Sequence, residues 1–200
     1  MKTIRILSFL SILLIAGCKK DNNPEKEQDG GKLTDIVPQD YLNEAKEMGF
    51  TVYWGNTPPD ISGTYRFAAW RLDADNTYEG FGTAPGYTIA NGFAASFTNQ
   101  TASSIDVSYQ GYYEGFENSK PWIMGSGNNF TVCRYIRMDA CGGNFRYNYM
   151  QLISGTKDGN VLKNVKMTSI GLDALSKDAM CVEEGNIEIW SDVDGISEPE

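Results

Sequence analysis

The chain has 200 residues, of which 41% are hydrophobic and 22% charged, with a net charge of −9 and no histidine. This length suits one main domain, and the acidic balance argues against nucleic acid or an anionic lipid surface as an electrostatic partner. The lack of histidine excludes Ser-His-Asp and Cys-His nucleophile systems, and it removes the commonest ligand of catalytic zinc and of haem.

The first residues have the pattern of a secretory signal. Lys2 and Arg5 precede an apolar run at 6–15, and the small residues Ala16 and Gly17 stand before Cys18. The run is shorter than the roughly 20 residues that a helix needs to cross a bilayer. We therefore expect residues 1–17 to be a signal peptide and Cys18 to become the first residue of the mature chain. An ordinary signal peptide with a coincidental cysteine is the alternative.

The segment after Cys18 predicts a flexible tether. Residues 19–32 are charged, lack large apolar side chains and end in two glycines and a lysine. Such a composition buries too little surface to offset the entropy lost on ordering. We expect residues 18–34 to form the tether and residues 35–200 to form a single domain.

One short helix is predicted at 38–49. Tyr41, Leu42, Ala45 and Met48 fall on one face of such a helix. Pro38 near the first turn and Gly49 at the end are typical of helix boundaries. A helix this short is stable only when it packs against the domain.

The remainder of the chain reads as strands and turns. Alternating apolar and polar residues at 105–110 are typical of a half-buried strand, and Gly142-Gly143 and Asp158-Gly159 are hairpin signals. The predicted fold is all-β, an antiparallel barrel of about eight strands with the short helix, and a β-sandwich is the alternative. The predicted strands are 50–54, 62–72, 87–97, 103–113, 130–138, 144–154, 161–170 and 186–190, with 77–82 as a candidate ninth.

Three cysteines remain when Cys18 is set aside. Strand parity about the turn at 142–143 places Cys133 opposite Leu152, and it places the loop containing Cys181 at the same end of the sheet as Cys141. In an oxidising compartment this arrangement predicts a Cys141–Cys181 disulfide and leaves Cys133 free. Three free thiols are the alternative.

Four segments together resemble a known group of proteins. Ile15-Ala16-Gly17-Cys18 resembles the lipobox of bacterial lipoproteins, in which a peptidase cuts before the cysteine and that cysteine carries acyl chains such as palmitate. With this lipobox, the chain resembles uncharacterised lipoproteins of the Bacteroidota whose domains look like lipocalin or calycin barrels. The other segments are Pro58-Pro-Asp-Ile-Ser-Gly-Thr-Tyr65 with the three residues before it, Leu152-Ile-Ser-Gly-Thr-Lys-Asp-Gly159, and residues 187–198 with Asp192-Val-Asp-Gly195.

The resemblance implies an address and a fold, and no reaction. It implies a membrane anchor through the lipid on Cys18 and a barrel domain, and it supplies no catalytic residues. Lys19 after the cysteine resembles the sorting of lipoproteins to the outer membrane in Gram-negative bacteria. The expected location is thus the cell envelope, at the outer membrane, facing either the periplasm or the surface.

Aromatic residues are the main candidates for ligand contact. Tyr offers flat apolar area and a hydroxyl, which suits sugar rings or amphipathic ligands, although β-domains also use aromatics in their cores. An arginine at position 134 shares a strand face with apolar neighbours, so it needs a carboxylate partner or a polar lumen that binds an anion. The candidate residues are Tyr65, Trp70, Tyr109, Tyr113, Arg134 and Tyr147.

Other chemistries find little support in the sequence. The acidic stretches at 73–79 and 192–195 lack the ligand spacing of an EF-hand calcium loop, and no metal or cofactor is expected. Glu114 and Glu117 are the candidate carboxylates of a histidine-free hydrolase. The favoured function is a non-enzymatic, monomeric binding module for a small apolar or glycan ligand. The alternative is a structural or protein-interaction lipoprotein whose barrel is filled with side chains.

Overall fold

The computed structural model describes residues 30–77, 84–89, 92–110, 116–117, 119–140, 145–174 and 184–200. Two helices, α1 (Gly30–Ile36) and α2 (Gln39–Glu47), precede the strands, and neither is long and apolar enough to cross a membrane. The strands are β1 (Gly63–Phe67), β2 (Trp70–Asp75), β3 (Thr88–Ile89), β4 (Phe93–Thr98), β5 (Asp106–Gln110), β6 (Phe116–Glu117), β7 (Trp122–Ser126), β8 (Asn129–Ala140), β9 (Phe145–Asp158), β10 (Val161–Ala174), β11 (Ile187–Asp192) and β12 (Ile196–Pro199).

The all-β prediction is correct, because every strand ladder among the described residues is antiparallel and belongs to one twelve-stranded sheet. The ladders of the described residues do not close this sheet into a barrel. A single antiparallel bridge between Ser104 and Trp122 connects the segment before β5 to β7.

Strand β10 is the branch point of the sheet. One edge pairs with β9 along its length, and the other edge pairs first with β12 and then with β11. The change of partner falls after Lys163, where the register shifts and Asn164 has a positive φ of 52°. Two wings leave β10 from this edge, one through β12, β1, β4 and β5 and the other through β11, β2 and β3.

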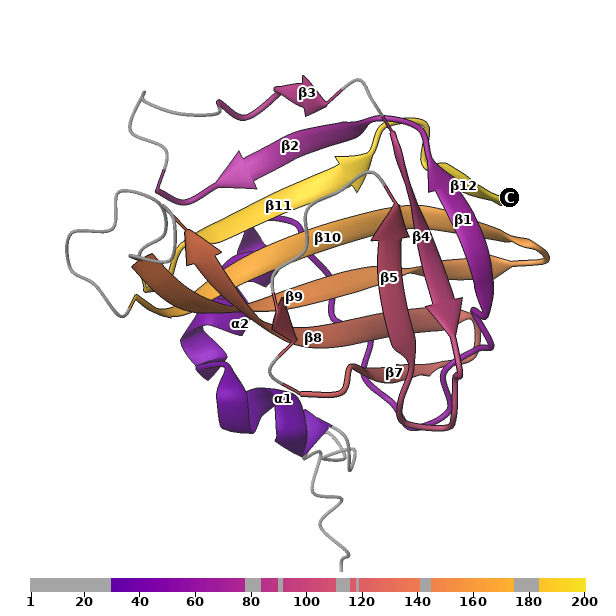
Figure 1. Cartoon of the computed structure of the whole chain (residues 1–200), viewed down its shortest axis with the longest axis horizontal. Helices are drawn as coiled ribbons and strands as arrows, with labels where there is room; N and C mark the ends of the chain where they lie inside the picture. The colour runs from indigo at the N-terminus through magenta and orange to yellow at the C-terminus, as the bar shows by residue number, and fades with distance from the viewer. Residues whose placement is uncertain are drawn as a thin grey trace, which may run out of the picture.

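We call β8, β9 and β10 the central strands, and the wing of β12, β1, β4 and β5 the first wing. The first wing and the helices cover opposite faces of the central strands (Figure 1). Phe93, Ala95 and Phe97 of β4 pack in one core with Ile153 of β9 and Met167 of β10. On the other face, α1 and α2 contribute buried apolar side chains to a second core with β9, β10 and β11. The central strands are therefore buried on both faces, and each fully buried aliphatic or aromatic side chain contributes roughly 1.5–3 kcal/mol.

The two wings meet at a corner of the sheet. At this corner the chain passes from β1 to β2, and later from β11 to β12. The predicted strand 62–72 is in fact β1 and β2, separated at Ala68 and Ala69, because β1 pairs with β12 whereas β2 pairs with β11. Asp192 ends β11 at this corner, opposite Trp70, and it accepts a hydrogen bond of 2.8 Å from the Ser197 hydroxyl.

Other predicted strands differ in their extent. The predicted strand 87–97 is divided into β3 and β4, again because the two parts belong to different wings. Residues 50–54 form no ladder; the Tyr53 amide instead donates to the Thr131 hydroxyl at 2.8 Å. Strands β6, β7 and β12 were not predicted from the sequence, and the candidate ninth strand lies almost wholly outside the described residues.

The folded part begins earlier than predicted. Helix α1 lies largely in the segment assigned to the tether, and Leu33 and Val37 are fully buried. Val37 directly follows α1, and its amide donates to the Leu33 carbonyl at 2.8 Å; the two side chains pack in the same core as Leu42 and Ala45 of α2. Helix α2 itself confirms the helix predicted at 38–49.

The two hairpin registers about β9 agree with the predicted turns. Cys133 pairs with Leu152, as strand parity predicted, and Val161 pairs with Asp158. Cys133 is a buried free thiol. The predicted disulfide partners, Cys141 and Cys181, and the anchor residue Cys18 lie outside the described residues.

Candidate functional site

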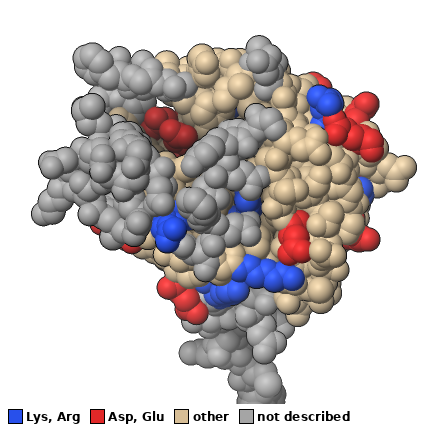
Figure 2. Space-filling view, viewed as in Figure 1, with Lys and Arg blue, Asp and Glu red and all other residues tan. Residues whose placement is uncertain are grey.

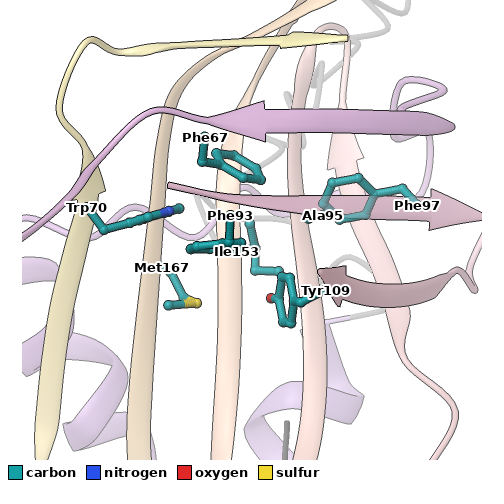
Figure 3. Close-up of a pocket in the computed structure, with 8 residues that line it drawn as sticks. All are labelled: Phe67, Trp70, Phe93, Ala95, Phe97, Tyr109, Ile153 and Met167. Carbon is teal, nitrogen blue, oxygen red and sulfur yellow. The ribbon is translucent and has the colours of Figure 1, made fainter. Parts of the chain in front are cut away.

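An aromatic hollow lies between the first wing and the central strands (Figure 3). The space among its lining side chains amounts to about 180 Å³ including its open side, and no part of it is wide enough for a water molecule. Ligand pockets usually offer at least about 300 Å³. The hollow is lined by Phe67, Trp70, Phe93, Ala95, Phe97, Tyr109, Ile153 and Met167.

The aromatic rings of the hollow contact one another closely. Trp70 stacks on Phe93, with centroids 5.5 Å apart and an interplanar angle of 12°. Tyr109 meets the same ring edge-on at 5.3 Å, and Phe67 is tilted against both Trp70 and Phe93. Such aromatic pairs stabilise a core by about 0.5–1.5 kcal/mol beyond the area that they bury.

A polar row crosses the same face of the central strands, one layer of residues beyond the hollow. Glu188 of β11 pairs with Ser169 of β10, Ser169 pairs with Gln151 of β9, and Gln151 pairs with Arg134 of β8. Residues that pair directly across antiparallel strands project from the same face, so these four side chains form a continuous row. Arg134 and Gln151 are almost fully buried, at 1% and 2% exposure.

Tyr109 joins the hollow to the polar row. Its ring lines the hollow, and its hydroxyl donates to Gln151 Oε1 at 2.9 Å. Arg134 donates to the same oxygen at 2.9 Å, and its guanidinium carbon lies 4.9 Å from the centre of the Tyr109 ring. The cation therefore lies against an aromatic ring, an arrangement that stabilises a desolvated charge.

The acidic end of the row is partly desolvated. Burial raises the pKa of Glu188, the negative charge of Asp75 raises it further, and the hydrogen bond from Trp190 lowers it. That bond runs from Trp190 Nε1 to Glu188 Oε2 at 3.2 Å. Figure 2 shows acidic side chains recessed beside β2 and β11, whereas the face over β4 and β5 is largely uncharged.

The structure brings three of the predicted ligand residues together. Trp70 and Tyr109 line the hollow, and Arg134 contacts Tyr109. Tyr147 is half-buried farther along β9, where its ring packs on Tyr149 at 5.9 Å. Tyr113 lies outside the described residues.

Tyr65 is buried but does not line the hollow. Its ring packs on Phe97 at 6.1 Å, and its hydroxyl accepts a hydrogen bond of 2.6 Å from Lys157 Nζ. Tyr65 therefore packs in the core beside Phe97, and its role as a ligand residue stays a prediction.

Most residues of the polar row were not predicted from the sequence. Gln151, Ser169 and Glu188 were not singled out, although strand parity could have found Gln151 opposite Arg134 once the turn at 142–143 was fixed. Phe67, Phe93 and Met167 carried no signal of their own, because core side chains and ligand-contact side chains have the same chemistry.

No group of three or more acidic, cysteine or histidine side chains that could hold a metal ion occurs in the part of the chain that the structure describes. Comparisons with known proteins add no assignment: no family model, no curated protein and no solved structure matches the chain.

Proposed function

We propose that the protein is an envelope lipoprotein, held at the outer membrane by acyl chains on Cys18, whose domain is a non-enzymatic module that binds a small apolar or glycan ligand. The observation that carries this proposal is the continuity of the aromatic hollow with the polar row through Tyr109. Aromatic rings offer a platform for an apolar group or a sugar face, and the row offers hydrogen-bonding groups beside it.

The polar row supports ligand binding because a packed core does not require it. Burying a polar group costs free energy unless hydrogen bonds compensate it, and burying an arginine costs more. Beside an apolar row of Val132, Ile153 and Met167, the Arg134–Gln151–Tyr109 arrangement keeps polar groups fixed at the interior. Ser169 and Glu188 are the more exposed members and would contact the ligand first.

We also propose that the sheet forms an eight-stranded barrel of the kind that the lipocalin resemblance implies, made of β1, β4, β5, β7, β8, β9, β10 and β12. The Ser104–Trp122 bridge supports closure, with amides of Ile105 and Ile123 donating across it at 3.3 and 3.4 Å. The pair between Lys120 and Asp106 continues the same contact at 3.6 Å.

A second candidate function rests on the packing of the hollow. Because its side chains leave no room for a water molecule, the hollow is closely packed in this conformation. A domain with a filled interior would act through its surface, as a structural or protein-interaction lipoprotein.

Native mass spectrometry of the full-length protein from its own host separates the two candidates. We expect a co-purified small molecule on the wild type and its loss from Ala95→Val, which adds two methyl groups to the hollow. Ala94→Val is the matched control, because Ala94 is also buried but does not line the hollow. The protein-interaction function is favoured instead if no added mass is found, or if the mass persists in Ala95→Val.

The membrane anchor has its own test. Replacing Cys18 by Ser removes the thiol that would carry the acyl chains, and two or more chains are needed for stable anchoring. We expect Cys18→Ser to move the protein from the membrane fraction to the soluble fraction, with loss of acyl mass. The change Cys133→Ser, at a buried cysteine inside the domain, should leave fractionation unchanged. Membrane-bound Cys18→Ser protein would contradict the proposed anchor.

A further inference from the structure

Trp70 carries a buried hydrogen-bond donor without an acceptor. The side chain is only 3% exposed, and among the described residues its Nε1 has no hydrogen-bond partner. The other tryptophan of this face differs, because Trp190 Nε1 donates to Glu188. An unsatisfied buried donor costs about 1–3 kcal/mol, and such groups in native proteins are rare.

The unsatisfied donor faces the aromatic hollow. Figure 3 shows the nitrogen-bearing edge of Trp70 turned toward the other lining side chains rather than away from them. The residues around it are apolar except for Tyr109, whose hydroxyl is already bonded to Gln151. The lining therefore offers apolar contact on all sides and a single free N–H group.

We propose that the aromatic hollow is a subsite for a small apolar or aromatic group that bears one hydrogen-bond acceptor, such as a carbonyl oxygen, which accepts from Trp70 Nε1. The inference rests on the proposed binding function and specifies the part of the ligand that enters the interior. The Trp70–Phe93 stack would contact the apolar group, and the N–H group would select the acceptor.

Entry into the hollow requires a side chain to move, since no space for a water molecule exists in this conformation. Met167 is the lining side chain best suited to move, because it is unbranched, carries a polarisable thioether and is 6% exposed. A rotamer change of Met167 would open the hollow toward Trp190, which pairs with Met167 on the neighbouring strand β11.

A pair of matched probes tests the proposal on the full-length protein with 15N-labelled indole groups. Acetophenone and ethylbenzene have similar shapes, but only acetophenone carries a carbonyl acceptor. We expect acetophenone to bind about two- to tenfold more tightly, which is the range that one neutral hydrogen bond gives. It should also shift the Trp70 indole N–H resonance downfield, whereas ethylbenzene should not.

Two variants assign the effect. Trp70→Phe keeps an aromatic ring in the stack but removes the donor, so it should lose the preference for acetophenone. Trp190→Phe removes an N–H group that already has an acceptor and should keep the preference for acetophenone. Thermal unfolding of each variant verifies that it is folded.

The outcomes separate this inference from the function on which it rests. If both probes bind the wild type equally and the Trp70 resonance does not move downfield, the acceptor requirement is wrong while the hollow remains a binding site. If neither probe binds up to its solubility, the hollow is not a binding site, and both the inference and the proposed function at this position fail.

Discussion

Replacing Gly125 by Ala is expected to lower the free energy of unfolding by about 3 kcal/mol or more. Gly125 has a φ of 146°, and a Cβ atom there would lie 2.1 Å from the carbonyl oxygen of Asn129. That oxygen belongs to the backbone of β8, so it cannot rotate away. The glycine is fixed from its other side as well, because its amide donates to Gly55 O at 3.0 Å.

Gly127 provides the matched control for this prediction. It lies two residues along the same hairpin with a φ of 60°, and a Cβ atom there would meet nothing within 4 Å. Gly127→Ala should therefore cost only about 1 kcal/mol, the price of a left-handed conformation. Chemical denaturation of both variants measures the difference, and equal losses would show that the close approach of β7 to β8 does not govern stability.

The carboxyl group of Asp192 is buried at the corner of the sheet, where it opposes Trp70. Burial raises its pKa from an ordinary value of 3.8 to about 6, while the hydrogen bond from Ser197 opposes the shift and the nearby Asp194 adds to it. Among the described residues, Asp192 Oδ1 has no hydrogen-bond partner. The charged form is therefore poorly solvated in the folded state.

The sign of the pH dependence follows from this shift. Between pH 3.8 and about 6 the folded state holds a proton that the unfolded state has released, so the free energy of unfolding falls as the pH rises. Above pH 6 the penalty is complete. We expect Asp192→Asn, which cannot ionise, to be more stable than the wild type by about 1–3 kcal/mol at pH 7.5 and nearly equal to it at pH 4.

Urea denaturation of both proteins across this pH range measures the difference directly. Subtracting the two curves cancels the contributions of other titrating groups. Asp194→Asn removes a charge that raises the Asp192 pKa. In that variant the pH-dependent fall in the free energy of unfolding should therefore end at a lower pH than in the wild type. A stability difference between wild type and Asp192→Asn that stays constant from pH 4 to pH 7.5 would contradict this account.

The hairpins of the central strands could be predicted because local residues determine them. Asp158-Gly159 lies at the β9–β10 hairpin, and a register centred on positions 142–143 with the period of two correctly predicted the pairing of Cys133 with Leu152. The corner at Ala68 and Ala69 carries no such signal. Alanine is not a turn former, and the interruption arises because two different strands, β11 and β12, pair with the two halves.

The candidate site was predictable only in part for the same reason. Trp70, Tyr109 and Arg134 stood out by residue type and by their places on predicted strands. The hollow depends on how the first wing folds over the central strands, which is a long-range property. Missed strands β7 and β12 show a related limit, because short apolar runs and a strand that ends at a proline lack clear alternation.

The placement of β12 and β11 has a consequence for how the chain folds. The last strand pairs with the first, joining Tyr65 to Pro199, and Asn76 accepts a hydrogen bond from the backbone of Ile187. Neither wing can be completed until the C-terminal residues have been synthesised, and contacts this distant in sequence form slowly. The sheet of a nascent chain of this design is therefore completed only after residues 187–199 have left the ribosome.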